Sequence, residues 1–260
     1  MNVEVLQNDP SLLRLGRKVT VFETIGSTQD EAHASALDGE AEGAVIVAES
    51  QTRGRGRHGR SWHSPSGKNI LASILLRPPI APREAQILTF AAACGVCEAV
   101  TTVSSLPARI KWPNDVTLSG LKLAGILTEA YSAGGRIDHA VLGIGLNVNM
   151  AREEWPEDLI GTATSLSAEA GKPFDRIAVL SVVLRGVDRW YARFLSEGPE
   201  PVLRAWRGLC DTLGRDVRVE MKDGIIEGRA EAVDGSGALL VRGRDGKIVV
   251  VVSGEVIHLR

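Results

Sequence analysis

From Leu213 to the C-terminus the sequence consists of short β-runs punctuated by glycine. The runs cover 216–221, 225–233, 237–242 and 247–252, with turn signals at Asp223-Gly224, Asp234-Gly235 and Asp245-Gly246. Short strands joined by tight turns favour a small closed β-barrel. A chain of 260 residues is long enough for one large and one small domain. We therefore predict two domains, 1–212 and 213–260.

The first 212 residues mix strand and helix patterns. Apolar or alternating runs predict strands at 18–24, 44–49, 69–77, 115–118, 123–131 and 137–146. Helical spacing predicts a helix at 174–197. An apolar, alanine-rich run predicts a buried helix at 83–103, and a short helix at 201–209 follows Pro201. A further helix is expected to begin at Ser27 or Thr28, because either residue is a good N-cap and two acidic residues follow in the first turn.

Composition excludes several classes of protein. Hydrophobic residues make up 44% and charged residues 24%, which is ordinary for a soluble globular protein. No run of roughly 18 apolar residues predicts a membrane span, and the N-terminus lacks the pattern of a secretory signal. Three cysteines argue against a disulfide framework. A net charge of −2 argues against a general polyanion binder. We expect a cytoplasmic protein.

Cysteine and histidine spacing gives no metal or redox signature. Cys94 and Cys97 form a single CxxC inside the predicted apolar helix 83–103, without a second ligand pair. The five histidines have no HExxH or similar spacing. Packing is the favoured interpretation of the two cysteines.

Glycine and arginine alternate in the segment Arg53–Arg60, directly after the predicted strand 44–49. Glycine lets the backbone approach a ligand closely, and arginine supplies permanently charged, planar donors for phosphate or carboxylate. The segment therefore fits a loop that encloses an anionic reaction centre. A flexible basic loop that binds RNA remains open from composition alone.

Two further segments place charged groups beside predicted strands. In Lys111–Asp115, Pro113 restricts the backbone, so an amide and a carboxylate are presented at a strand entry. Such a pair suits a magnesium ion or an incoming amine; a solvated loop is the alternative. Lys122 opens an apolar strand and by alternation shares a face with Ala124, Ile126 and Thr128. It either neutralises a bound anion or extends to water.

The segment Gly143–Asn149 holds paired glycines in an apolar strand. Such a pair allows close approach of a flat ligand, although tight strand packing is the default interpretation of a single GxG. Taken together, an arginine-glycine lid, a lysine, an Asn-Asp pair and a glycine strand are the parts of an enzyme that forms acyl adenylates.

These segments resemble, in this order, the biotin protein ligase (biotin–[acetyl-CoA-carboxylase] ligase) family, from about Val19 to the C-terminus. The resemblance rests on GRGR at 54–57, KWPND at 111–115 and KLAGIL at 122–127. It implies an α+β catalytic domain, with a mixed β-sheet backed by helices as in class II aminoacyl-tRNA synthetases, followed by an SH3-like barrel. It also implies that biotin reacts with ATP to give biotinyl-5′-AMP and pyrophosphate, and that a lysine of a biotin carboxyl carrier domain then accepts the biotin.

The resemblance also implies roles for individual residues. Ser27, Thr28 and Gln29 match positions at the ureido ring of biotin, with Gln29 standing where the family has Asn. Gln51, Arg55, Gly56 and Arg57 match the loop that binds biotin and the adenylate. Lys122 matches a lysine at the acyl phosphate, and Trp62 and Asn147 match positions against adenine. Lys111 and Asn114 would serve the phosphates and Mg²⁺, and Asp115 the incoming lysine amine. His58 receives no role.

The family resemblance predicts ATP and Mg²⁺ as co-substrate and activator, and no tightly bound prosthetic group. Too little chain precedes Lys18 for a three-helix DNA reader, so we expect a ligase that binds neither DNA nor membrane. Whether it forms a homodimer stays open. The rival functions are a lipoate or octanoyl protein ligase, which lacks the GRGRxGR and KWPND pair, and a non-catalytic RNA-binding module.

Overall fold

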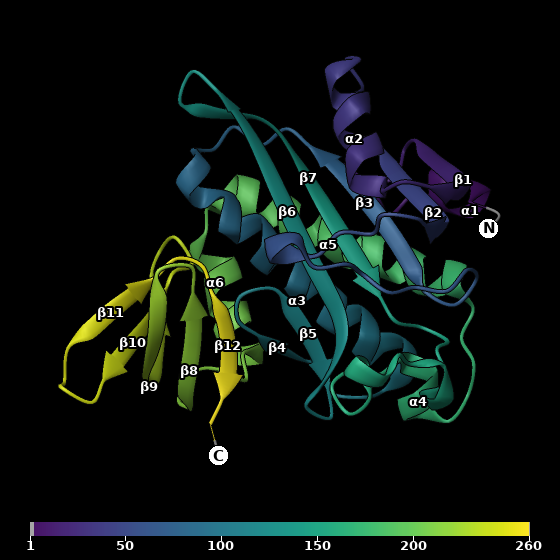
Figure 1. Cartoon of the computed structure of the whole chain (residues 1–260). Coiled ribbons are helices and arrows are strands. Elements are labelled where there is room, and N and C mark those ends of the chain that lie inside the picture. The colour runs from purple at the N-terminus through teal and green to yellow at the C-terminus, as the bar shows by residue number, and fades with distance from the viewer. Residues whose placement is uncertain (1–2, 260) are drawn as a thin grey trace.

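The computed structural model describes residues 3–259, which form two β-sheets and a set of helices (Figure 1). The larger sheet has seven strands in the order β1-β2-β3-β7-β6-β5-β4. Their bounds are β1 Val19–Ile25, β2 Val45–Gln51, β3 Ile70–Leu76, β4 Arg109–Lys111, β5 Asp115–Leu118, β6 Leu121–Ala133 and β7 Arg136–Leu146. The pair β1 and β2 is parallel and the other pairs are antiparallel, so the sheet is mixed, as expected.

Helices cover both faces of this sheet, because its strands alternate buried side chains between two apolar layers. Ala72 and Ile74 of β3 belong to the main core, whereas Leu75 packs with Ala36 of helix α2 (Thr28–Leu37). The main core lies under α3 (Ala85–Ser104), α5 (Arg176–Glu197) and α6 (Glu200–Leu209). In Figure 1, α2 lies in front of the sheet and α3 and α5 lie behind it.

Short helices complete this part of the chain. They are α1 (Glu4–Gln7), α4 (Leu166–Ala170) and 3₁₀ turns at Arg57–Gly59, Pro82–Glu84, Arg152–Glu154 and Glu157–Leu159. Periodicity did not predict α1, α4 or the three-residue strand β4, because segments of three to five residues are too short to show a period.

One helix, Pro82–Ser104, is long and apolar enough to cross a membrane by length and composition. However, 72% of its most apolar window is buried inside the protein. It packs between the sheet and α5, so its apolar residues serve the core.

The C-terminal sheet has five antiparallel strands in the order β11-β10-β9-β8-β12. They are β8 Asp216–Met221, β9 Gly224–Val233, β10 Leu239–Gly243, β11 Ile248–Val251 and β12 Glu255–His258. The SH3-like expectation agrees with this sheet, but within residues 3–259 β11 and β12 form two unpaired edges, so the prediction of a closed barrel was wrong. The strand β12 was not predicted, and the domain boundary near residue 212 stays a prediction.

Trp112 joins the two sheets. Its side chain is 1% exposed, and its indole Nε1 donates a hydrogen bond of 3.0 Å to the carbonyl of Gly237, in the turn between β9 and β10. Its backbone N–H donates to Thr212 Oγ1 at 3.1 Å. Burying a tryptophan with its polar atom satisfied fixes the barrel beside the strands that carry Lys111 and Asp115.

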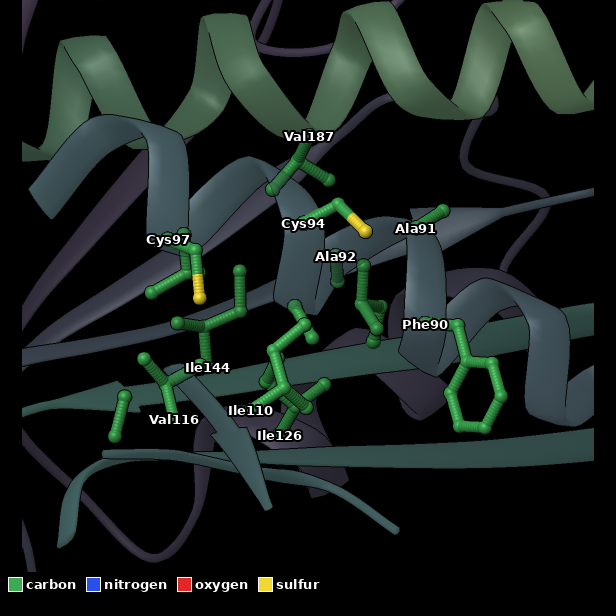
Figure 2. Packing of buried hydrophobic residues seen from close by; sticks show 14 of the residues in the cluster. Phe90, Ala91, Ala92, Cys94, Cys97, Ile110, Val116, Ile126, Ile144 and Val187 are labelled. Atoms are coloured by element: carbon green, nitrogen blue, oxygen red, sulfur yellow. The ribbon is translucent and has the colours of Figure 1, made fainter. Parts of the chain in front are cut away.

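The two cysteines of the CxxC pair lie in the main core (Figure 2). Burial raises the pKa of the Cys97 thiol to about 12 and that of Cys94 further. A buried neutral thiol is a poor nucleophile and a poor metal ligand. No group of three His, Cys, Asp or Glu residues between 3 and 259 could hold a metal ion. The structure therefore agrees with a packing role.

Helices α3 and α5 touch through their backbones where Gly95 meets Gly186. A Cβ atom added at Gly95 would lie 2.5 Å from the Val187 backbone nitrogen, and one at Gly186 would lie 2.6 Å from the Gly95 carbonyl oxygen. Both contacts are with backbone atoms, so a side chain at either glycine would fit only if the two helices moved apart.

We predict that Gly95→Ala lowers the free energy of unfolding by about 1–3 kcal/mol, the usual cost of overpacking a core. Urea denaturation measures this change. The matched control is Gly208→Ala in the exposed part of α6, where an added Cβ meets nothing within 4 Å. That variant should gain up to about 1 kcal/mol from helix propensity. Equal stability of the two variants would contradict the packing account.

Candidate active site

A polar pocket lies at the N-terminus of α2. Ser27 caps this helix through its Oγ, which accepts from the Gln29 backbone N–H at 3.3 Å. Gln51 Oε1, at the end of β2, accepts from the Thr28 N–H at 2.7 Å. The Ser73 hydroxyl on β3 lies 2.8 Å from Thr28 Oγ1 and 3.0 Å from Gln29 Oε1. Three elements thus place hydroxyl and amide groups, all uncharged, around one point.

Gln29 is held in a single orientation. Its Nε2 donates to the Leu127 carbonyl at 3.3 Å and to Glu129 Oε2 at 3.0 Å, both on β6. A Cβ at Gly143 of β7 would lie 2.8 Å from Gln29 Oε1, so a larger residue there would displace the amide. One glycine of the pair in 143–145 therefore makes room for Gln29.

Trp62 lies against the sheet over a cross-strand pair of glycines. Gly125 of β6 faces Gly145 of β7, and an added Cβ on either would come within 2.8 Å of the indole. The sequence suggested that the glycines of β7 make room for a flat group. At Gly145 this flat group is the indole of Trp62. Trp62 Nε1 is buried without a hydrogen-bond partner in the described chain, and Lys122 Nζ lies 5.6 Å from the ring centroid.

Lys122 faces this same layer, and the prediction that it shares a face with Ala124, Ile126 and Thr128 was wrong. A β-bulge in β6 pairs Val116 with Ala124 but Thr117 with Lys122, which inserts one residue and reverses the alternation. The Lys122 side chain therefore reaches Gly125 and Trp62. Its Nζ lies 2.7 Å from Asp115 Oδ1, an ion pair without the angle of a hydrogen bond.

The arginine-glycine segment is an ordered turn. A bridge joins Arg55 to Ser61, and the Gly56 N–H donates to the Arg60 carbonyl at 2.7 Å. Arg55 Nη2 lies 2.9 Å from Asp30 Oδ1 and 2.8 Å from Glu129 Oε2. Its guanidinium thus links the turn to α2 and β6, which argues against the flexible basic loop.

Arg57 and Arg60 attach the same turn to the C-terminal sheet. Arg57 donates to Asn114 Oδ1 at 3.2 Å, to the Gly254 carbonyl at 3.3 Å and to Ser253 Oγ at 2.8 Å. Arg60 binds the Glu255 carboxylate through both of its Nη atoms. Burial lowers the pKa of Arg57, and the Arg60 contact lowers the pKa of Glu255.

Asn147 stands at the end of β7 beside a second, larger cavity. Its Nδ2 donates to the Thr164 carbonyl at 3.0 Å, while its Oδ1 is buried without a partner among residues 3–259. The cavity has a volume of about 420 Å³, and its lining includes Trp62, Lys111, Lys122 and Trp155. An unpaired buried carbonyl oxygen is costly unless a ligand donor satisfies it.

The structure brings together the residues that the sequence singled out. Arg55 and Lys122 line the pocket at α2, Arg55 and Arg57 line the hollow under the turn, and Arg57, Lys111 and Lys122 line the space beside Asp115. Gly56 lines the hollow under the turn. Sequence reasoning missed Ser73, Glu129, Ser253 and Glu255. Glu129 ends the Lys122–Glu129 segment, so a carboxylate in an apolar strand was its available signal.

Two family models match this chain. The model of the Biotin/lipoate A/B protein ligase family matches residues 21–147, and that of the biotin protein ligase C terminal domain matches residues 212–259.

Curated relatives and solved structures agree with these matches. A biotin–[acetyl-CoA-carboxylase] ligase of Mycobacterium tuberculosis is 36% identical over 94% of this chain and 90% of the relative. A bifunctional ligase/repressor BirA of Bacillus spizizenii is 34% identical over 89% of this chain and 71% of the relative. The structure of a biotin protein ligase from Aquifex aeolicus in complex with biotin and ATP has a TM-score of 0.79 and 29% identity, covering 94% and 99% of the two chains.

We predict that Glu255→Gln increases the rate of tryptic cleavage within Arg53–Arg60 several-fold. The substitution removes the charge that holds Arg60, so the turn opens more often and exposes its arginine peptide bonds. Limited proteolysis with mass spectrometry measures the rate. The control is Glu227→Gln. Glu227 is an exposed carboxylate of the barrel that pairs with Arg244. Equal cleavage of both variants would contradict the attachment.

Proposed function

The chain belongs to the biotin protein ligase family, and on that premise we propose which of its side chains carry each step of the reaction. The enzyme activates biotin with ATP and transfers the biotin to a carboxylase. In the first step a biotin carboxylate oxygen attacks the α-phosphorus of ATP, and pyrophosphate leaves. In the second, a lysine amine attacks the acyl carbon of biotinyl-5′-AMP, and AMP leaves.

The pocket of Ser27, Thr28, Gln29, Gln51 and Ser73 receives the ureido ring of biotin. A ureido group has two N–H donors and one carbonyl acceptor, and the pocket offers hydroxyl and amide groups of both kinds. Its polar groups are uncharged, which suits a neutral ring. Glu129 and Leu127 hold the Gln29 amide in position, so Gln29 serves in place of the shorter Asn of the family.

Lys122, Arg55, Arg57 and Lys111 stabilise the first step. Negative charge builds on the phosphate oxygens while the acyl phosphate forms, and cations already in place lower the energy of that state. Arg55 and Lys122 pair with carboxylates within the site, and Arg57 donates to a neutral carbonyl, so each can exchange that partner for a phosphate oxygen. Arg57, joined to both Asn114 and the barrel, closes over the adenylate and limits its hydrolysis.

Asp115 serves the second step. An acceptor lysine has an unperturbed pKa near ~10.4 and must lose a proton before it attacks. Asp115 lines the cavity beside Lys122, and its Oδ1 is buried without a hydrogen-bond partner in the described residues. Once Lys122 turns to the phosphate, this oxygen is free to accept the proton of the incoming amine.

The site fits a magnesium ion that is carried mainly by the nucleotide. Asn114 Oδ1 would be the protein oxygen donor at this place, and Mg²⁺ commonly combines one or two protein oxygens with phosphates and water. Magnesium supplies charge neutralisation at the phosphates. Lys111, which lines the same space, adds a protein cation.

Adenine occupies the cavity beside Asn147. The unpaired Asn147 Oδ1 suits the amino group of a purine, and Trp62 supplies a flat apolar surface. The further expectations concern the setting of the enzyme: a cytoplasmic location, a biotin carboxyl carrier domain as acceptor, and no binding of DNA or membrane.

The convergence of Arg55, Arg57 and Lys122 on connected cavities is the observation that carries these assignments. Purified protein incubated with biotin, ATP, Mg²⁺ and a carrier domain should therefore biotinylate the carrier, as a streptavidin blot detects. Lipoate in place of biotin should give no product on a matching anti-lipoate blot. A product that forms only with lipoate would favour the rival ligase.

We predict that Lys122→Ala lowers the rate of biotin-dependent pyrophosphate release by about 10²–10³-fold, because a cation at the acyl phosphate is lost. The control is Lys68→Ala, whose ammonium pairs with Glu154 outside these cavities. It should keep the wild-type rate. Pyrophosphate release by Lys122→Ala at the wild-type rate would rule out the assigned role.

We predict that Asp115→Asn lowers transfer to the carrier lysine by about 10²–10⁴-fold, the usual range for loss of a general base. Adenylate formation should change much less. Hydroxylamine, which is unprotonated at neutral pH, should still capture the biotinyl group at nearly the wild-type rate. A variant that loses both acceptors equally would show that Asp115 acts on the adenylate and not on the amine.

A further inference from the structure

Glu129 joins the polar pocket at α2 to the arginine-glycine turn through one oxygen atom. Its Oε2 accepts from Gln29 Nε2 at 3.0 Å and from Arg55 Nη2 at 2.8 Å. Gln29 belongs to the pocket assigned to the ureido ring, whereas Arg55 belongs to the turn assigned to the adenylate. The Glu129 side chain is 28% exposed, so both bonds form where water competes little and a charged acceptor binds strongly. One carboxylate thus serves two parts of the site.

The contacts of Gln29 fix which end of its amide faces the pocket. Its Nε2 donates to the Leu127 carbonyl and to the Glu129 carboxylate, two groups that can only accept. The amide nitrogen therefore points to β6, and Oε1 faces Ser73, whose hydroxyl oxygen lies 3.0 Å away. Gln29 thus presents an acceptor to the pocket, which suits an N–H of a ureido ring. Without Glu129, the amide would keep only the longer bond of 3.3 Å to Leu127 and could rotate.

A stack of rings fixes the spacing between α2 and β6 next to this contact. On α2, Gln29 and His33 are one turn apart. On β6, Glu129 and Tyr131 lie on the same face. The ring of Tyr131 stacks on His33 with centroids 3.9 Å apart and on His139 of β7 at 4.6 Å. The helix is therefore held against the strands without Glu129, whose carboxylate orients side chains and not the backbone.

Arg55 has a second carboxylate partner, which allows the two roles of Glu129 to be separated. Asp30 Oδ1 lies 2.9 Å from Arg55 Nη2, and the Asp30 side chain is 51% exposed. Both carboxylates hold the guanidinium, but of the two Glu129 alone also binds the Gln29 amide. A change at Asp30 therefore affects the turn, whereas a change at Glu129 affects the turn and the ring pocket together.

We propose that Glu129 is a positioning residue for biotin, an inference that rests on the proposed function. It keeps the Gln29 carbonyl directed at the ureido ring and the Arg55 guanidinium directed at the adenylate. The two ends of the intermediate are thereby held in register by one carboxylate. Glu129 acts through these two side chains, so its loss weakens the binding of biotin more than the binding of ATP.

The test removes the carboxylate while keeping the strand filled. Glu129→Leu removes both acceptor oxygens but leaves a side chain of similar size, and Glu129→Gln keeps one oxygen at this place. The control is Glu23→Leu, the same change at an exposed carboxylate of β1. Asp30→Asn removes the charge of the other Arg55 partner. The measurements are the Kd of biotin alone by calorimetry, the KM values for biotin and ATP in pyrophosphate release, and the half-life of biotinyl-5′-AMP on the enzyme.

We expect Glu129→Leu to raise the Kd and the KM for biotin by about tenfold, the cost of losing a hydrogen bond to a charged group. The KM for ATP should stay within about threefold of wild type. Glu129→Gln should recover most of the loss, and Glu23→Leu should be normal in every assay. Asp30→Asn should shorten the retention of biotinyl-5′-AMP and leave the Kd of biotin within about twofold of wild type. An unchanged Kd of biotin in Glu129→Leu would overturn the proposal.

A double substitution separates positioning from a general effect on the fold. In a Gln29→Ala background the amide is already absent, so adding Glu129→Leu should raise the Kd of biotin by no more than about threefold further. A full tenfold effect in that background would overturn the proposal, because Glu129 would then act through something other than Gln29. A wild-type protein that forms no biotinyl-5′-AMP would instead contradict the proposed function itself.

Discussion

The ion pair between Lys122 and Asp115 is the contact on which the rest of the site depends. It places a cation and a carboxylate 2.7 Å apart at the junction of the cavities. The neighbouring arginines repeat the arrangement, Arg55 with Asp30 and Glu129, and Arg60 with Glu255. Partly buried charges need partners of opposite sign. In the proposed mechanism a phosphate replaces the Asp115 carboxylate at Lys122, and Asp115 then accepts a proton from the incoming amine.

Small residues in the sheet provide the space for this chemistry. Gly125 and Gly145 let Trp62 lie flat on two strands, and Gly143 admits the amide of Gln29. A side chain at any of these positions would push the ligand-facing groups away from the strands. The glycines therefore set the depth of the site, while the polar residues of α2, β2 and β3 set its chemistry.

Ten strands were predicted from apolar or alternating runs and turn signals, and four helices from apolar runs, helical spacing or, for α2, its N-cap. Periodicity failed at Lys122, because a single inserted residue in β6 reverses the alternation and nothing in the local sequence marks the bulge. It also missed Ser73 and Glu255. Their roles come from strands that meet only in three dimensions, so no spacing along the chain could reveal them.

Ser253 and Glu255 of the C-terminal barrel hold the arginine-glycine turn, which in the proposed mechanism encloses the adenylate. The turn and the cation Lys122 thus line connected spaces at one end of the sheet. A crystal structure with biotinyl-5′-AMP tests this account most directly. It should show Lys122 Nζ and the Arg57 guanidinium in hydrogen-bond contact with the phosphate, and Lys122 moved away from Asp115. A phosphate bound elsewhere, with the Lys122–Asp115 pair intact, would contradict the account.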